Sequence, residues 1–296
     1  MDSPAKISIV TPSLNQGSTI EETILSVLAQ KDPDFEHIVI DGGSTDETLG
    51  VLERFPHLRW VSEDDRGQTD AINKGLEMST GEIVAYLNSD DVYRPDAFAN
   101  VRTAFHENET SDVVVGSCDI IDAQSRTVGK YAARLDSRTF LPCFWLWEKN
   151  VCIPQPGVFI RRQALEHVGL FDDSYDMAMD FEMWLRLAEY SDFVILDETL
   201  AGFRIAPGTK SMTRRADMVL DCYRAAQGYI HFSNEPTRFR MELRRETAGH
   251  LLTIAEEHGE RPDASRSPAQ CAQIAVGIWP PILLSSRAWR IFSGMA

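Results

Sequence analysis

The sequence lacks paired cysteines, and this absence limits the class of protein. Its five cysteines are scattered, with no C-x-x-C pair among them: Cys118, Cys143, Cys152, Cys222 and Cys271. Such a pattern argues against a disulfide framework or a zinc site. It favours a reducing compartment, and we expect a cytoplasmic protein.

An excess of basic residues and long apolar runs are also missing. Lysine and arginine total 29 against 45 aspartate and glutamate residues, so the net charge is −16. A chain of this charge is not expected to bind nucleic acid. No apolar run reaches the ~18 residues of a membrane-spanning helix. The start shows no basic segment followed by an apolar one, so we expect no secretory signal.

Two glycine-rich nucleotide-binding fingerprints are absent as well. The first turn that follows a predicted strand reads TPSLNQGST, without G-x-G-x-x-G, and no G-x-x-x-x-G-K-[ST] occurs anywhere. A dehydrogenase of the Rossmann type and a P-loop enzyme are therefore excluded. If a nucleotide binds, we expect a metal ion rather than a glycine-rich loop to hold its diphosphate.

Apolar runs typical of buried strands alternate with segments of helical periodicity. Strands are predicted at residues 6–11, 36–41, 58–62, 83–87, 112–117 and 158–160. Helices are predicted to start with capping boxes at Ser18 and Ser44, and to cover 69–78, about 98–105, 178–190, 218–232 and 238–257. The alternation predicts an α/β fold, a doubly wound, mostly parallel sheet flanked by helices.

The stretch EIVAYLNSDD, residues 82–91, carries the strongest chemical signal. A buried-type strand ends there in Asn88, Ser89, Asp90 and Asp91. Adjacent carboxylates repel each other, but they become favourable around a divalent cation, and Mg²⁺ is held by one or two carboxylates plus phosphate oxygens. Ligands bind at the carboxyl ends of strands in such sheets. The alternative is a turn with helix-capping aspartates.

Two more polar clusters follow predicted strands. Thr11, Pro12 and Ser13 end the first strand, and Asp41 ends the second. A nucleotide lying across the sheet edge would meet both clusters and Asp90. Ser13 would serve the base or ribose, and Asp41 would accept a hydrogen bond from the base, although turn chemistry is the alternative for Asp41.

Seven segments together resemble family 2 glycosyltransferases with a GT-A fold. They are PSLNQGSTIEETILSVLAQ, IDGGSTDET, SEDDRGQTDAINKG, TGEIVAYLNSDD, QPGVFIRRQAL, AMDFEMWLRLAE and FRIAPGTKS. The resemblance implies a nucleotide-sugar donor (a UDP-, dTDP- or GDP-sugar) and Mg²⁺ or Mn²⁺ as cofactor. It implies a GT-A catalytic domain at 1–212, divided into a nucleotide-binding half (1–117) and an acceptor-binding half (118–212).

Carried over residue by residue, the resemblance implies a donor-binding set and a metal site. The donor-binding residues would be Thr11, Pro12, Ser13, Asp41, Asp65, Asp70, Lys74, Asn88, Ser89, Arg204 and Lys210. Asn73 would brace the adjacent loop. Asp90 matches the metal-binding acid of the family's D-x-D motif, with Asp91 as the nearby second carboxylate. Asn88 stands where the motif has its first acid, so metal binding would depend mostly on Asp90.

Asp180 lies in the first turn of the helix predicted at 178–190, where the helix dipole favours a carboxylate. Capping is its alternative role. The resemblance implies that Asp180 is the general base of an inverting enzyme, a role that contributes ~10²–10⁴-fold to the rate. Gln155 and Trp184 are expected on the acceptor side. Many relatives have Glu at the place of Met179.

The segment 203–211 resembles the loop that closes on the donor diphosphate, with Arg204 and Lys210 as phosphate partners. Many relatives carry His where this chain has Ala206. The alternative is an ordinary hairpin with exposed basic residues. The aromatic run at 139–147 is expected to be core, with a place beside the acceptor as its alternative.

Residues 213–296 are expected to form a helical C-terminal extension with a polar linker at 261–268. Its tail, 270–296, is amphipathic and locally basic. We expect it either to contact a membrane surface peripherally, at the inner face, or to pack on the domain or on a second copy of the chain.

We therefore expect an inverting glycosyltransferase that moves a sugar to a hydroxyl of a saccharide or lipid-linked acceptor in bacterial polysaccharide or glycolipid biosynthesis. One alternative is a sugar-phosphate nucleotidyltransferase, which the absence of a glycine- and arginine-rich phosphate loop disfavours. The other is a non-catalytic module that binds nucleotide sugars or saccharides, which Asn88 and Ala206 favour.

Overall fold

The computed structural model describes residues 5–32, 34–136, 151–206, 209–232, 234–258, 263, 265–285 and 291. The aromatic run at 139–147 lies outside these residues. So does most of the predicted amphipathic tail beyond residue 285.

The elements follow one another in this order. The first part holds β1 (Ile7–Ser13), α1 (Ile20–Leu28), β2 (Phe35–Asp41), α2 (Thr48–Leu52), β3 (Arg59–Ser62), α3 (Gln68–Met78), β4 (Ile83–Tyr86), β5 (Val92–Tyr93), α4 (Ala97–Glu107), β6 (Val113–Ile121), β7 (Thr127–Tyr131) and β8 (Arg134–Leu135). Then come β9 (Val151–Cys152), η2 (Gln155–Gly157), β10 (Val158–Arg161), α5 (Arg162–Val168), α6 (Met179–Tyr190), β11 (Phe193–Arg204), α7 (Lys210–Thr213), α8 (Arg215–Gly228), η3 (Ile230–Phe232), α9 (Pro236–Glu257), α10 (Pro268–Ile278) and η4 (Pro280–Leu284).

Contacts group the chain into two compact units. Unit 1 comprises Met1–Asp136, Asn150–Asp173 and Arg186–Ile205, and unit 2 comprises Ser137–Lys149, Ser174–Leu185 and Ala206–Ala296. The domain division expected at residue 212 stays a prediction.

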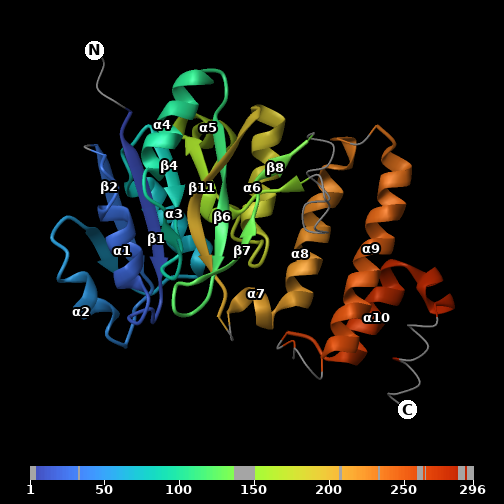
Figure 1. Cartoon of the computed structure of the whole chain (residues 1–296). Helices are drawn as coiled ribbons and strands as arrows, with labels where there is room; N and C mark the ends of the chain where they lie inside the picture. Colours follow the sequence, from blue (N-terminus) through green and yellow to red (C-terminus); the bar gives the residue numbers. More distant parts are fainter. Residues whose placement is uncertain are drawn as a thin grey trace. The chain divides into compact units, whose positions relative to one another are not determined.

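Unit 1 is built on one large sheet with the strand order β3-β2-β1-β4-β10-β6-β11-β5, and β7 pairs with β6 (Figure 1). Strands β1, β2, β3 and β4 run parallel to one another, and β6 and β11 form a second parallel pair. The α/β fold with a doubly wound sheet is thus confirmed. Strand β10 runs antiparallel to both β4 and β6, which ends the simple alternation of parallel strands and helices after β4.

Both faces of the parallel strands are covered, because alternate side chains of a strand point to opposite faces. On β2, Ile38 and Ile40 pack with Ala71 of α3. The intervening Val39 packs with residues of α1 and α2. Helix α3 approaches β1 closely at Gly75, where a Cβ atom would lie only 2.3 Å from Val10 Cγ1. This contact packs α3 directly against β1.

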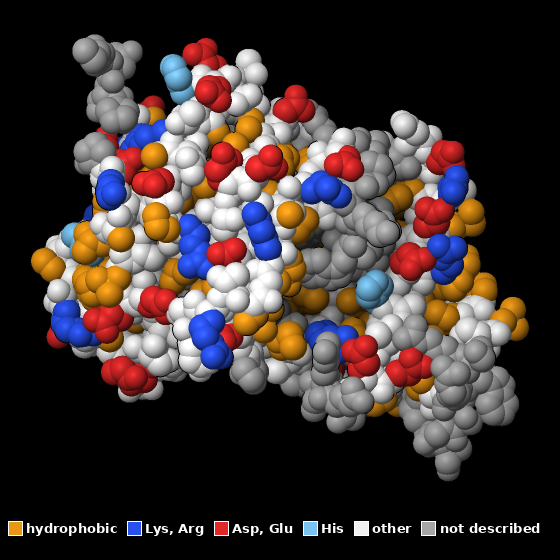
Figure 2. All heavy atoms as spheres, in the orientation of Figure 1, with side chains coloured by type: hydrophobic (Ala, Val, Ile, Leu, Met, Phe, Trp, Pro, Cys, Tyr) orange, Lys and Arg blue, Asp and Glu red, His pale blue; other side chains and the backbone are white. Residues whose placement is uncertain are grey.

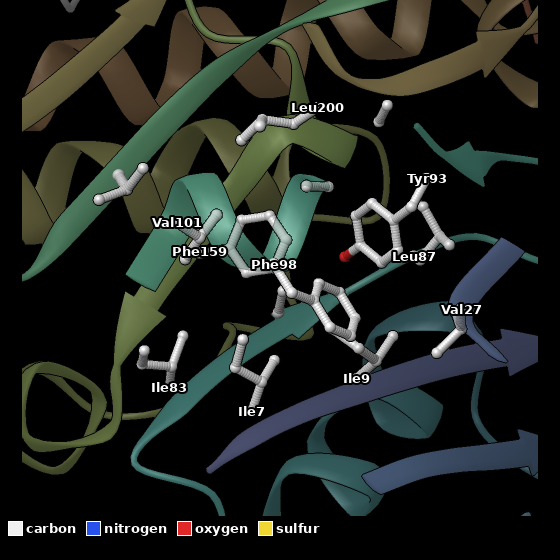
Figure 3. Packing of buried hydrophobic residues seen from close by; sticks show 14 of the residues in the cluster. Ile7, Ile9, Val27, Ile83, Leu87, Tyr93, Phe98, Val101, Phe159 and Leu200 are labelled. Atoms are coloured by element: carbon white, nitrogen blue, oxygen red, sulfur yellow. The ribbon is translucent and has the colours of Figure 1, made fainter. Parts of the chain in front are cut away.

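The main apolar cluster of unit 1 joins β1, β4, α4 and β10 (Figure 3). The ring of Phe98 on α4 makes edge-on contacts with Tyr93 and Phe159, at centroid distances of 5.4 and 6.2 Å. Such aromatic pairs add about 0.5–1.5 kcal/mol each beyond their buried area. Tyr93 lies two residues after Asp91, so this cluster fixes the main chain at the end of the polar turn that follows β4.

The two expected capping boxes are wrong. Helix α1 begins without a side-chain cap, so Ser18 does not cap it. Helix α2 also begins without a side-chain cap. The Ser44 hydroxyl donates to Asp41, 2.5 Å away, and accepts from the amide of Asn15 at 2.7 Å, so it is used inside the turn and not by a helix amide. A true capping box lies instead at Ser267 and Gln270, at the start of α10.

Unit 2 contains the expected C-terminal helices, and α9 packs against both α8 and α10. The predicted polar linker contains Asp263, which is 5% exposed and accepts a hydrogen bond from the amide of Ala216 at the start of α8. None of the helices in the described part of the chain is long and apolar enough to cross a membrane. Acidic and basic side chains are interspersed on the face shown in Figure 2.

Candidate active site

The turn after β4 holds two neighbouring carboxylates in different surroundings. Asp91 is 1% exposed, and its two oxygens accept hydrogen bonds from the amide N–H of Arg204 (2.8 Å) and from Asn88 Nδ2 (3.2 Å). Burial, followed by the nearby charge of Asp90, raises the pKa of Asp91 well above the ordinary value, and these hydrogen bonds oppose the rise. Asp91 is therefore directed into the protein.

Asp90 is the half-buried member of this pair. Among the described residues, no other side chain is hydrogen-bonded to its carboxylate. Burial raises the pKa of Asp90, and the positive charge of Arg204 partly offsets the rise. Asp90 is therefore the carboxylate of this turn that can face a ligand.

The donor set fits a cation that is shared with a substrate better than one held by protein alone. Within the described parts of the chain, no group of three or more His, Cys, Asp or Glu side chains is placed to hold a metal ion. Mg²⁺ commonly keeps several waters and uses one or two carboxylates together with substrate phosphates. Asp90 by itself meets that requirement.

Asn88 is held at both ends of its amide. Its Oδ1 accepts from Gln68 Nε2 at 2.7 Å, and its Nδ2 donates to Asp91 and, at 3.4 Å, to Gln155 Oε1. Gln155 in turn donates to the carbonyl oxygen of Tyr86 at 2.9 Å. An aspartate at position 88 could not donate to Asp91, so the amide stabilises the second carboxylate. Sequence reasoning gave no role to Gln68, although this residue lies inside the quoted segment SEDDRGQTDAINKG.

Asp41 and Ser13 end neighbouring parallel strands but differ in their partners. Asp41 is fully buried and accepts hydrogen bonds from the amide of Ser44 (2.9 Å) and from the hydroxyls of Ser44 (2.5 Å) and Ser62 (2.7 Å). Its carboxylate therefore organises the turn after β2. Ser13 Oγ is buried and has no hydrogen-bond partner within the described part of the chain. An orphaned hydroxyl at a strand end is available to a ligand.

Thr11 faces the interior. Its hydroxyl lies 2.9 Å from Nε2 of His37, and both residues are buried. Burial, with a smaller contribution from His57, lowers the pKa of His37 to about 3, so this imidazole is neutral at physiological pH. The arrangement gives no direct support to a contact between Thr11 and a donor. Pro12 and Ser89 are buried as well.

The segment before α3 carries paired charges. Asp70 accepts from Arg66 at 2.7 Å, and hydrogen bonds from Arg66 lower its pKa. Lys74 lies 2.9 Å from Glu63 and 3.4 Å from Asp70. Asp65 accepts from the amide of residue 67 at 2.8 Å. Their contact with a donor stays a prediction.

The side chain of Asn73 has a bracing role, as expected, but on a different segment. It exchanges two hydrogen bonds with the main chain of Phe171, at 2.8 and 3.0 Å.

The two basic residues predicted at the diphosphate already have partners. Arg204 is 4% exposed, and its guanidinium is hydrogen-bonded inside unit 1. Lys210, in unit 2, donates to the carboxylate (2.5 Å) and the carbonyl oxygen (3.0 Å) of Asp176. Arg214 binds the other carboxylate oxygen of Asp176 at 2.5 Å. Phosphate binding by Arg204 receives no support from these contacts, whereas Lys210 would have to exchange partners.

Asp180 lies in the first turn of α6, in the part of the helix that belongs to unit 2. Its carboxylate accepts a hydrogen bond from the amide of Phe181 at 2.7 Å. Burial raises the pKa of Asp180. Trp184 on the same helix is 1% exposed, which gives no support to a contact between its ring and an acceptor. That Asp180 and Asp90 serve one site stays a prediction.

The large, mostly parallel sheet with flanking helices is typical of the GT-A fold, and solved structures agree. The chain is similar to Staphylococcus aureus TarS 1–349 in complex with UDP-GlcNAc, with a TM-score of 0.65 and 18% identity over 97% of this chain and 83% of that one. It is also similar to the mannosyltransferase PcManGT from Pyrobaculum calidifontis in complex with GDP-Man and Mn²⁺, with a TM-score of 0.60 and 19% identity over 99% and 84% of the two chains. These likenesses establish the GT-A fold.

The family model described as Glycosyl transferase family 2 matches residues 8–169, and the chain belongs to this family. A PGL/p-HBAD biosynthesis glycosyltransferase of Mycobacterium bovis is 31% identical over 185 residues, which cover 60% of this chain and 68% of the relative. An uncharacterized glycosyltransferase of Nostoc sp. is 35% identical over 173 residues, covering 55% and 53%. The family resemblance inferred from the motifs is thus confirmed, and glycosyl transfer is the class of reaction.

Proposed function

We propose that this chain is a metal-dependent, inverting glycosyltransferase that moves a sugar from a nucleoside-diphosphate sugar to an acceptor hydroxyl. One observation carries the proposal. Ser13, whose hydroxyl has no hydrogen-bond partner among the described residues, ends β1, and the half-buried Asp90 follows β4; these two strands are parallel and hydrogen-bonded to each other. In an open α/β sheet this edge is where a nucleotide binds.

The donor side of the site combines one free hydroxyl with a rigid turn. Ser13 binds the base or ribose, and Asp41 keeps the neighbouring turn in shape through its bonds to Ser44 and Ser62. Asp65 and Asp70 border the donor. The donor complexes of TarS and of the archaeal mannosyltransferase support a nucleotide sugar as ligand.

Asp90 would hold a divalent cation, Mg²⁺ or Mn²⁺, with the diphosphate oxygens and water as the remaining ligands. When bound, such an ion neutralises charge that develops on the leaving diphosphate. The Mn²⁺ in the similar mannosyltransferase supports this assignment. Lys210 adds a positive charge after it exchanges Asp176 for a phosphate oxygen.

Asp180 is proposed as the general base. It takes the proton of the acceptor hydroxyl while the hydroxyl oxygen bonds to the anomeric carbon and the bond from that carbon to the phosphate oxygen breaks. A single displacement inverts the anomeric configuration. The raised pKa of Asp180 suits a base, because a more basic carboxylate accepts a proton more readily.

Two variants test these roles after a thermal-shift screen of nucleotide sugars with Mn²⁺ has identified the donor. Asp180→Asn should reduce transfer by ~10²–10⁴-fold while leaving donor affinity nearly unchanged. Asp90→Ala should remove the Mn²⁺-dependent part of donor binding measured by calorimetry. Equal loss of affinity and rate in Asp180→Asn would contradict the base assignment. Wild-type protein that neither transfers nor hydrolyses any donor would favour a non-catalytic binding module.

The acceptor is proposed to be a saccharide or a lipid-linked saccharide in a bacterial polysaccharide or glycolipid pathway. The name of the mycobacterial relative supports a glycolipid context. A cytoplasmic location, peripheral membrane contact through 270–296 and a homo-oligomer remain part of this proposal. Flotation with anionic vesicles and light scattering test the last two.

A further inference from the structure

Arg204 is a buried arginine that contacts the turn of Asp90 and Asp91, here called the carboxylate turn. It ends strand β11, and its side chain is 4% exposed. Its Nε donates to the carbonyl oxygen of Asp90 at 2.7 Å, and its own amide N–H donates to Asp91 Oδ1 at 2.8 Å. Arg204 thus holds both aspartates of the turn: its side chain binds the main chain of Asp90, and its main chain binds the side chain of Asp91.

The far side of the guanidinium is tied to two other segments of unit 1. Nη2 lies 2.7 Å from Glu22 Oε2 on α1. Nη1 donates to the carbonyl oxygen of Asp122 at 2.9 Å and to Ser125 Oγ at 3.0 Å, both in the turn between β6 and β7. Ser125 also donates to Glu22, at 2.8 Å. The carboxylate turn is therefore connected to a helix and a hairpin that lie far away in the sequence.

We infer that Arg204 is a positioning residue that fixes the main chain of the Asp90 turn for cation and diphosphate binding. This inference rests on the proposed function of that turn. Each nitrogen of the guanidinium donates a hydrogen bond, and among the described residues Glu22 is its ion-pair partner. Because a buried charge is costly unless it is paired and hydrogen-bonded, this set of acceptors suits an arginine. A lysine would keep the charge but could not make these bonds from a planar fork.

The contacts of Arg204 with Asp90, Asp91, Glu22, Asp122 and Ser125, which we call the clamp, also explain why its guanidinium is not available to bind phosphate. Each of its three side-chain nitrogens donates to a protein acceptor, so its effect on a nucleotide-sugar donor passes through Asp90. Residues that orient a metal ligand typically contribute 10–100-fold to metal affinity or activity.

Arg204→Lys tests the inference, with calorimetry of UDP binding in Mn²⁺ and in EDTA. We expect the Mn²⁺-dependent gain in UDP affinity to fall by about 10–100-fold, while UDP affinity in EDTA stays unchanged. The measurement is made at a temperature where circular dichroism shows a folded variant. Arg102→Lys is the matched control, because Arg102 is a largely buried arginine bound to Asp32 and to main-chain oxygens elsewhere in unit 1.

The control should lower the melting temperature without changing the Mn²⁺-dependent gain. If Arg204→Lys does not fold, Glu22→Gln decides, since the Glu22 side chain is 47% exposed and the substitution removes only the negative charge that pairs with Arg204. A smaller loss of the Mn²⁺-dependent gain is then expected.

An unchanged gain in the folded variant, or the same loss in Arg102→Lys, overturns the clamp alone. A wild-type protein whose UDP affinity does not rise with Mn²⁺ overturns the proposed function itself.

Discussion

Glu36 offers a quantitative test of how the parallel strands are held together. Its carboxylate accepts hydrogen bonds from Ser8 on β1 (2.6 Å) and from the amide and hydroxyl of Thr80 before β4 (2.6 and 2.9 Å). It also forms ion pairs with Lys6 and Arg59. Glu36 therefore joins β2 to both neighbours at the end of the sheet opposite the candidate site.

The magnitude follows from the pKa of Glu36. Burial raises this pKa, but the hydrogen bonds outweigh burial and lower it from 4.5 to about 2. One pKa unit corresponds to 1.36 kcal/mol, so the ionised side chain, 10% exposed, adds about 3 kcal/mol to the free energy of unfolding. Because the folded-state pKa is the lower one, this contribution is complete above about pH 5 and is lost as the pH falls toward 2.

Glu36→Gln should therefore lower the free energy of unfolding by about 2–3 kcal/mol at neutral pH, and the difference from wild type should shrink below about pH 4. Chemical denaturation at a series of pH values measures both. Glu21→Gln is the control, since Glu21 forms an exposed ion pair with Arg54 and should cost less than about 1 kcal/mol. A difference that is absent at neutral pH, or that does not change with pH, would refute the reasoning.

Three further predictions concern the site. Burial raises the pKa of Asp180 above its ordinary value of 3.8, so the transfer rate should decrease as the pH falls through this raised pKa. A rate that is constant down to about pH 4 contradicts a catalytic base at this position. Asp176→Asn removes the carboxylate that holds Lys210, so calorimetry should find UDP affinity raised by about 2–5-fold, and a lower affinity would exclude the partner exchange. A Cβ at Gly42 would lie 2.5 Å from Asp65 Oδ2, so Gly42→Ala should turn this carboxylate away. Donor affinity should then drop about tenfold with little change in melting temperature, and unchanged affinity would remove Asp65 from the donor site.

Much of the architecture could be predicted because it depends on local patterns. Strand β4 is a continuous apolar run and strands β1 and β2 contain shorter ones, while α3, α4 and α6 repeat apolar residues at helical spacing. Helix starts were less predictable. Ser44 has a capping-box spacing, yet its hydroxyl oxygen accepts from the amide of Asn15, 29 positions away in the sequence, and helix α2 has no side-chain cap.

Functional roles were named from position and from the family resemblance, and they stay predictions. Asp90 stands out as a carboxylate after a buried strand, whereas a carboxylate in a first helical turn also suits capping, so Asp180 was named through the resemblance. Trp184 could not be assigned by type, since an aromatic ring suits a core and a sugar site equally well, and the structure buries it.

The sequence by itself determined the family, the alternation of strands and helices up to β4, and the acids at the sheet edge, because these depend on neighbouring residues and on motif spacing. Tertiary structure alone decided which acid of the pair is turned inward and what Arg204 does. Arg204 pairs with Glu22 across 182 positions of the sequence. The partner of a buried charge is chosen by which segments pack together, and no local pattern contains that information.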